Sequence, residues 1–372
     1  MMRTKVGLYI HIPFCIKKCN YCDFCSYPNL DLDIRSRYIE KLCQEISIYG
    51  NKNIEVDTIF FGGGTPTLLS TEEFEHIVNQ IRKNFIVSAD VEFTIEANPG
   101  TTNFQKMIDF ARIGVNRFSI GLQTIHKNEL KKLGRIHDFE EFNQTYNDLR
   151  KIGITNINID LMYGIPHQTL DTFEKTLDQV LNLGPEHLSV YGLILEEGTP
   201  FYIERDTLDI PDEDIECNMY NLAARKLKEA GYIHYEISNY AKEGKESKHN
   251  LKYWHCDEYI GIGVSAHSYF DGRRYSNSGD IFDYIANPIQ ISTSEKLDIE
   301  EQKYEFIMLA LRLKEGFSLS KYKFRFNEDF MSGREELINK MILMGYVSLD
   351  GDILSLTEKG FYVSNSILAE LL

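Results

Sequence analysis

The sequence predicts an α/β fold in which parallel strands alternate with helices, followed by a smaller α+β region. Three observations predict this fold. Strand-like and helix-like patterns alternate through six units before residue 196. Polar residues lie at or just past the ends of several of these strands, which is the ligand-binding edge of a parallel sheet. After residue 196 the alternation stops, and a hairpin pattern comes near the C-terminus.

The composition is that of a globular protein with two or three domains. The chain has 372 residues, of which 43% are hydrophobic and 26% are charged. Its formal net charge of −16 disfavours a nucleic-acid or anionic-membrane binder, because attraction to phosphate needs a basic face. Four of the seven cysteines cluster near the start, which does not resemble a disulfide framework. With no signal peptide or transmembrane run apparent, we expect a cytoplasmic protein.

The first predicted strand covers residues 6–12 and leads into a cysteine-rich loop. Cys15, Cys19 and Cys22 have C-x3-C-x2-C spacing, and Cys25 follows three residues later. Iron–sulfur clusters are normally held by cysteine thiolates, four for a cubane cluster. If only the first three bind, one iron stays open for a small molecule. The alternative is a structural zinc site, whose ligands usually come as two separated pairs, and no separated second pair follows.

Five further strand–helix units follow the cysteine loop. The predicted strands cover residues 57–61, 91–95, 117–120, 156–162 and 187–193. The predicted helices cover 34–49, a segment from Ser70 with Glu73 in a capping box, 102–112, 127–133, 139–152 and 170–183. Right-handed crossovers place such helices outside a parallel sheet. A closed barrel would need eight units, so six units predict an open sheet.

Candidate binding residues stand at the strand ends. The run Gly62-Gly63-Gly64-Thr65 follows the second strand, and its glycines would let a ligand approach free backbone amides. Glu96, Gln123 and Asp160 lie at the ends of the next three strands. The alternatives are a tight turn for the glycine run and surface charges for the acids. All would meet at one edge of the sheet, so we expect a shared site.

These features resemble the radical S-adenosylmethionine (SAM) superfamily. Through Tyr9-x-His11-Ile12-Pro13-Phe14-Cys15, the match extends to the family of the oxygen-independent coproporphyrinogen III oxidases. The resemblance implies a partial (β/α)6 barrel with a [4Fe–4S] cluster on Cys15, Cys19 and Cys22, whose open iron SAM chelates. It also implies that SAM is bound by Tyr9, Gly63, Gly64, Thr65, Glu96, Gln123, Arg135 and Asp160. His11 either tunes the cluster or packs at the barrel floor.

The middle of the chain carries a second motif. A predicted helix covers residues 212–230, and strand-like runs at 232–237 and 259–270 flank His249-Asn250-x-x-Tyr253-Trp254. The last segment resembles the H-N-x-x-Y-W motif of HemW-type haem chaperones, which implies haem binding. Imidazole is a standard axial haem ligand, so His249 is the candidate iron ligand beside the rings of Tyr253 and Trp254. Cys256 is an alternative ligand, and an aromatic packing cluster is the alternative to a haem site.

The C-terminal region has a winged-helix pattern. Helical patterns cover residues 300–313 and 335–344, and a hairpin covers 345–356 with Asp350 and Gly351 at its turn. The acidic balance favours a packing role over DNA binding. We therefore predict three parts: the partial barrel at 1–195, a connecting haem-binding region at 196–290, and a winged-helix-like domain at 291–372.

Two departures from the oxidase pattern direct the functional interpretation. Oxidase loops have a fourth cysteine two residues after the third, where this chain has Phe24, with Cys25 one place later. The first cluster cysteine is already residue 15, so we do not expect the oxidase's N-terminal extension. The resemblance thus implies a haem chaperone that uses an electron donor and delivers haem to an acceptor, such as a membrane-bound respiratory enzyme. The alternatives are a coproporphyrinogen III oxidase and a cluster-bearing DNA-binding regulator.

Overall fold

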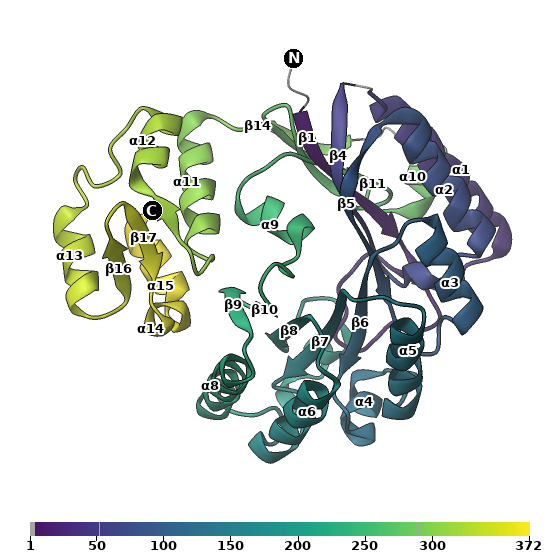
Figure 1. The fold of residues 1–372 in the computed structure, drawn as a ribbon, viewed down its shortest axis with the longest axis horizontal. Coiled ribbons are helices and arrows are strands. Elements are labelled where there is room, and N and C mark those ends of the chain that lie inside the picture. Colours follow the sequence, from purple (N-terminus) through teal and green to yellow (C-terminus); the bar gives the residue numbers. More distant parts are fainter. Residues whose placement is uncertain (1–3, 52, 289–290) are drawn as a thin grey trace.

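The fold is built on one open, twelve-stranded mixed sheet, described here from a computed structural model. The structure describes residues 4–51, 53–288 and 291–372. Six parallel strands lie side by side in sequence order and curve into a crescent (Figure 1). They are β1 (Thr4–Ile12), β4 (Ile54–Gly63), β5 (Ile86–Ala97), β6 (Arg117–Gln123), β7 (Ile157–Tyr163) and β8 (His187–Gly192). This confirms the predicted partial barrel.

The helices of the six units lie on the outer, convex side of the crescent (Figure 1). They are α1 (Leu32–Tyr49), α2 (Thr71–Asn84), α3 (Phe104–Ile113), α4 (Lys127–Leu133), α5 (Phe139–Lys151) and α6 (Leu170–Leu183). The predicted capping box of α2 is present, with Ser70 accepting from the amide of Glu73 and Glu73 accepting from that of Ser70. The apolar faces of these helices and of the strands form one continuous core.

The sheet continues beyond the six predicted strands on both sides. A seventh parallel strand, β11 (Tyr259–Ile262), pairs with β1, so that Gly7 lies opposite Tyr259. Antiparallel strands β12 (His267–Phe270), β13 (Arg273–Asn277) and β14 (Ile291–Lys296) extend that edge. The other edge carries β10 (Asn239–Ala241) and β9 (Ile233–Glu236). The single run predicted at 259–270 is therefore two strands, separated by a turn in which Gly263 and Ser265 have positive φ.

A short helix, α9 (Lys248–Trp254), lies on the concave side of the sheet (Figure 1). The backbone amides of Lys248 and His249 donate to the carboxylate of Glu92 on β5, at 3.1 and 3.0 Å. The ammonium of Lys252 lies 2.9 Å from the carboxylate of Asp57 on β4. These contacts fix α9 against the inner wall of the partial barrel. The other helices between residues 196 and 290 are α7 (Pro200–Ile203), α8 (Glu213–Glu229) and α10 (Ile281–Ala286), of which α10 packs against α1.

The C-terminal region forms its own core beside the sheet. Its elements are α11 (Ile299–Ala310), β15 (Phe317–Ser318), α12 (Leu319–Phe326), α13 (Glu335–Leu343), β16 (Val347–Asp350), β17 (Ile353–Leu356), α14 (Glu358–Tyr362) and α15 (Ser364–Leu371). Helices followed by a β-hairpin confirm the winged-helix-like pattern. The turn comes one residue later than predicted: Asp350 pairs with Ile353, and Gly351, with φ +58°, and Asp352 form the turn.

The predicted division at residues 195 and 290 stays a prediction, and residue 290 itself lies outside the described residues. Strands from both sides of residue 195 share the large sheet, because β9 to β13 flank the six barrel strands.

Candidate functional site

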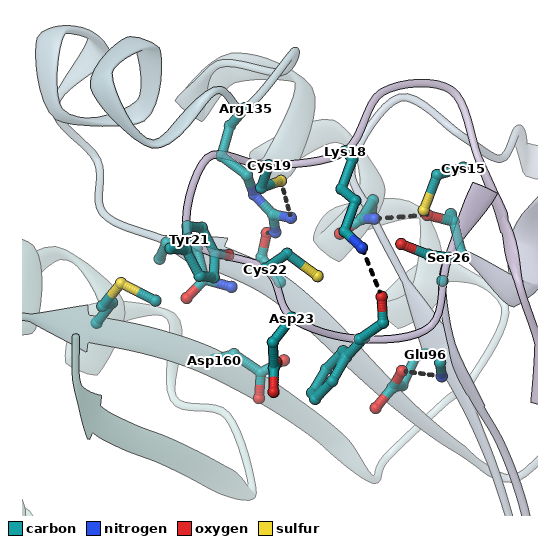
Figure 2. A pocket seen from close by; sticks show the side chains of 18 of the residues that line it. Cys15, Lys18, Cys19, Tyr21, Cys22, Asp23, Ser26, Glu96, Arg135 and Asp160 are labelled. Atoms are coloured by element: carbon teal, nitrogen blue, oxygen red, sulfur yellow. Dashed lines mark hydrogen bonds between the residues drawn. The ribbon is translucent and has the colours of Figure 1, made fainter. Parts of the chain in front are cut away.

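The cysteine loop and the strand ends enclose one cavity of about 380 Å³. Figure 2 shows side chains of the loop on one side of this cavity and Glu96 of β5 and Asp160 of β7 on the other, and residues of β6 also line it. Ten of the predicted cluster and SAM residues line it: Cys15, Cys19, Cys22, Gly63, Gly64, Thr65, Glu96, Gln123, Arg135 and Asp160. The structure thus brings these ten residues to one cavity, while their roles as ligands stay predictions.

Two short strands, β2 (Phe14–Cys15) and β3 (Tyr27–Pro28), pair at the start and end of the cysteine loop and fix its base. Burial raises the pKa of Cys15, and it raises the pKa of Cys22 to about 11. These two thiols are therefore protonated near neutral pH, and a bound metal centre would displace their protons.

Cys25 lies apart from these thiols. Its Sγ donates to the carbonyl of Gly279 at 3.4 Å, and it is absent from the residues lining the cavity. Phe24, which stands where oxidase loops have their fourth cysteine, does line the cavity. The chain therefore presents three loop thiols to the cavity.

The glycine run has a conformation that requires glycine. Gly63 has φ +108°, and a Cβ there would lie 2.5 Å from the ring of His11. A Cβ at Gly64 would lie 2.6 Å from the carbonyl oxygen of Phe14. The absence of side chains lets the end of β4 pack directly against the cysteine loop, where the amides of Gly64 and Thr65 donate to the carbonyls of Ile12 and Phe14 at 2.8 and 2.7 Å. The expectation of free amides in this run is therefore wrong, because close packing against the loop pairs them.

Glu96 and Asp160 are two of the four carboxyl groups that line the cavity. The Glu96 carboxylate accepts from the amide of Gly63 at 3.1 Å. Burial, with the negative charge of Asp160, raises the pKa of Glu96 to about 8. Burial also raises the pKa of Asp160, which accepts from Asn158 at 2.7 Å. A cationic ligand group bound near both acids would favour their ionised forms.

Gln123 and Arg135 also line the cavity, and Arg135 lies beside Cys19. Gln123 has φ +71° at the end of β6, and its side-chain oxygen accepts from the Tyr191 hydroxyl at 2.8 Å. The Arg135 guanidinium reaches Cys19 Sγ at 3.7 Å. Within the described part of the chain, buried Arg135 Nε has no hydrogen-bond partner. A guanidinium with a spare donor suits an incoming carboxylate.

Tyr9 is the predicted SAM residue that does not line the cavity. Its hydroxyl lies 3.1 Å from His11 Nδ1, and its ring stacks on Phe60 with centroids 6.1 Å apart. A Cβ at Gly62 would touch both the Tyr9 ring and the Glu96 carboxylate, so Tyr9 lies just beneath the cavity wall. His11 is buried, with Nε2 2.8 Å from the carbonyl of Cys25, which places it under the loop.

Several lining residues went unpredicted, among them Lys17, Lys18, Tyr21, Ser119 and Tyr191. Lys17, Lys18 and Tyr21 lie inside the cysteine loop itself. Their position between the predicted cluster ligands could have marked them as residues of the same site. Ser119 and Tyr191 lie on β6 and β8, where alternation along the strand assigns a face but not a role.

The H-N-x-x-Y-W residues lie elsewhere, on α9. His249 is buried, and its ring nitrogens lie 2.8 Å from the hydroxyl of Thr58 and 2.8 Å from that of Tyr253. Burial lowers the pKa of His249 to about 3, so its imidazole is neutral. Tyr253 and Cys256 line a separate cavity of about 240 Å³ against α11, and Trp254 is half-buried. In this arrangement both ring nitrogens of His249 are engaged.

The residues around the cavity of about 380 Å³, which we call the cluster cavity, fit an iron–sulfur cluster with SAM. Three thiols on one loop, a backbone cradle that tolerates no side chain and a spare guanidinium donor converge there. Among the described residues, no set of three His, Cys, Asp or Glu side chains is placed to hold a single metal ion. A cubane cluster is larger than one ion, and it is bound by thiolates that surround it rather than meet at a point.

Comparison with known proteins settles the family. The radical SAM superfamily model matches residues 9–180, and the HemN C-terminal domain model matches residues 297–363. A protein named heme chaperone HemW from Buchnera aphidicola subsp. Acyrthosiphon pisum is 36% identical, covering 98% of this chain and 97% of its own. The proteins of that name from Bacillus subtilis and Escherichia coli are 35% and 34% identical, each over 98% of this chain.

The chain belongs to the radical SAM superfamily, in the oxygen-independent coproporphyrinogen III oxidase-like family, and it is similar over nearly its full length to the HemW proteins. Membership implies a [4Fe–4S] cluster and SAM. The solved structure of coproporphyrinogen III oxidase (HemN) from Escherichia coli has the same fold, with a TM-score of 0.88 at 24% identity over 100% of this chain and 91% of that one. In the described part of this radical SAM protein, no helix is long and apolar enough to cross a membrane.

Proposed function

We propose that this protein is a haem chaperone of the HemW type. It binds haem, a [4Fe–4S] cluster and SAM, and it passes haem to an acceptor protein in the cytoplasm or at the membrane surface. The observation that carries the proposal is full-length similarity to proteins named as haem chaperones, at 34 to 36% identity, together with a three-thiol cavity.

In this proposal the cluster is held by Cys15, Cys19 and Cys22. SAM would bind in the same cavity, beside the cluster. The backbone of the glycine run, the acids Glu96 and Asp160, and the guanidinium of Arg135 would bind and orient SAM from the protein side. Gln123, held by Tyr191, and Thr65, whose hydroxyl accepts from Asn98 at 2.8 Å, complete the wall. Tyr9 supports this wall from beneath.

Two features favour the chaperone over the oxidase. Phe24 replaces the fourth loop cysteine, and the neighbouring Cys25 points to Gly279 rather than into the cavity. The chain therefore lacks a fourth thiol at the place where the oxidase pattern has one. A coproporphyrinogen III oxidase remains the rival function because of the shared fold.

An anaerobic assay separates these two functions. Purified protein with a reconstituted cluster is incubated with a reductant, SAM and coproporphyrinogen III, with a bona fide oxidase as the positive control. We expect no protoporphyrinogen IX from this protein and a stable complex with haem. Formation of protoporphyrinogen IX would overturn the chaperone proposal.

The haem ligand needs a separate experiment. His249 can reach haem iron only if its hydrogen bond to Thr58 or Tyr253 breaks, whereas the Cys256 thiol already lines a cavity. Haem titrations of the wild type, His249→Ala and Cys256→Ala, followed by Soret position and Kd, identify the ligand. We expect the spectrum to change in His249→Ala, as the motif predicts. A change in Cys256→Ala alone would assign the ligand to Cys256.

The winged-helix-like domain suggests a third function, a cluster-bearing DNA-binding regulator. The net charge of −16 opposes it, because DNA binding relies on basic side chains. A salt-dependent shift of duplex DNA by the purified protein would support this alternative. The expected result is no shift at any salt concentration.

A further inference from the structure

A second large cavity, of about 760 Å³, lies where the edge of the sheet meets the C-terminal domain. It is lined by α8, β9, α14 and the segment around Lys314, and we call it the α8–α14 cavity. It shares no lining residue with the cluster cavity. Its volume is within the range of about 300 to 1,000 Å³ that small-molecule and cofactor sites occupy.

The walls of the α8–α14 cavity are tied together by specific contacts. The amide of Lys314 donates to the carbonyl of Tyr235 at 2.9 Å, which joins the C-terminal domain directly to β9. The Tyr362 hydroxyl of α14 donates to the carbonyl of Cys217 on α8 at 3.0 Å. The cavity is therefore part of a defined junction and not a gap between unconnected parts (Figure 1).

The side chains that line this cavity are mainly basic, whereas the chain as a whole is acidic. Arg225, Lys228 and Lys314 line it with a single carboxylate, Glu358, in a protein of net charge −16. Lys228 pairs with Glu358 and Arg225 pairs with Glu229, each at 3.3 Å, but all four side chains are exposed, and such pairs contribute little. In the described residues, no carboxylate lies within ion-pair distance of Lys314, whose ammonium is 5.1 Å from the ring centroid of Phe361. The site thus suits a ligand with more than one negative group.

The remaining wall is aromatic. The Tyr220 and Tyr362 rings meet edge to face with centroids 4.9 Å apart, and the His234 ring lies 5.7 Å from that of Phe361. All four rings line the cavity. Flat π-surfaces of this kind pack against planar apolar ligands. Cationic side chains beside aromatic rings suit a ligand with a planar apolar ring system and carboxylate groups at its edge.

We propose that the α8–α14 cavity binds a porphyrin dicarboxylate, with the ring against the aromatic wall and the carboxylates at Lys228, Lys314 and Arg225. This inference rests on the proposed function, because haem is the porphyrin that such a protein would carry. It goes further by assigning a binding site outside α9 that recognises the ring and its carboxylates rather than the iron. A protein that must release haem benefits from a site that makes no bond to the metal.

The test uses protoporphyrin IX, which has the same ring and carboxylates but no iron. Its binding to the full-length protein is followed by quenching of Trp254 and by porphyrin fluorescence. The test variant is Lys228→Gln/Lys314→Gln, and the matched control is Lys175→Gln/Lys323→Gln, which removes two positive charges outside the cavity. We expect roughly a tenfold or greater loss of affinity in the test variant, as for lost charge-assisted contacts, and no loss in the control or in His249→Ala.

The outcomes separate the two proposals. Haem binding by the wild type, with protoporphyrin IX affinity equal in the test and control variants, would overturn the cavity assignment and leave the chaperone proposal standing. Absence of haem binding by the wild type would overturn the chaperone proposal itself. Competition by ADP at concentrations near those of the porphyrin would show a general site for planar anions and overturn the porphyrin assignment. Unchanged thermal unfolding of both variants confirms that they fold.

Discussion

Replacement of His249 by Gln tests whether the histidine of the H-N-x-x-Y-W motif is sealed inside the partial barrel. The imidazole lies between the hydroxyls of Thr58 and Tyr253, each at 2.8 Å, and burial lowers its pKa to about 3. In the unfolded chain a histidine has a pKa near 6.5. Between these two values the unfolded state binds a proton that the folded state does not. Acid therefore removes stability that this residue contributes above pH 6.5.

The magnitude follows from the difference between the two pKa values. Each pH unit below about 6.5 costs the folded wild type about 1.4 kcal/mol through His249, until the pH approaches the folded pKa. Between pH 7.5 and pH 5 the loss is about 2 kcal/mol. The Gln variant lacks this titration. The difference between the free energies of unfolding of the wild type and the variant should therefore decrease by about 2 kcal/mol when the pH is lowered from 7.5 to 5.

Urea denaturation at several pH values gives this difference directly. Trp254 is the chain's single tryptophan and belongs to the same helix as His249, so its fluorescence reports on the relevant region. His76→Gln, which replaces an exposed histidine, controls for the loss of a histidine as such. A difference that stays constant from pH 7.5 to pH 5 would refute the reasoning. It would mean that His249 takes up a proton in the folded protein as readily as in the unfolded chain.

The other predictions concern the cluster cavity. Replacing Cys15, Cys19 or Cys22 by Ser should abolish bound iron and the visible absorption of the cluster, because each thiol is needed as a ligand. Cys25→Ser should retain both the iron and the absorption. Loss of the cluster in Cys25→Ser would contradict the three-thiol assignment. Arg135→Ala should weaken SAM binding about tenfold to hundredfold, since a charge-assisted contact contributes about 1.5 to 3 kcal/mol, and unchanged affinity by calorimetry would exclude that contact. Removing iron with a chelator should weaken SAM binding to the otherwise intact protein, and equal affinity before and after would show that SAM binds without the cluster.

Much of the cavity could be predicted from the sequence because topology brings distant residues together. Glu96, Gln123 and Asp160 lie on three successive parallel strands, and the carboxyl ends of such strands meet at one edge. Local signals were equally informative where backbone geometry depends on one residue. Gly63 has a positive φ that disfavours other residues, and Ser70 with Glu73 marks the start of α2.

The parts that could not be predicted depend on long-range pairing and on the direction of side chains. Nothing local marks Tyr259 as a partner of Gly7, because β11 is four residues long and its pairing is set by the rest of the sheet. Similarly, the motif gave the residue types on α9 but not the face that His249 turns toward the barrel wall. The α8–α14 cavity combines residues about 140 positions apart, such as Tyr220 and Tyr362, so no window of sequence contains it.

The pairing of β1 with β11 has a consequence for biosynthesis. The strand that leads into the cysteine loop has one neighbour, β4, available early, while the other is made some 250 residues later. Until residue 262 has left the ribosome, one side of β1 is an unpaired strand edge, which is prone to pairing with other chains. A nascent chain or a fragment that stops at residue 195 has this open edge next to its cluster cysteines. Complete synthesis should therefore precede secure assembly of the cluster loop, and chains that stop early should be the ones that aggregate.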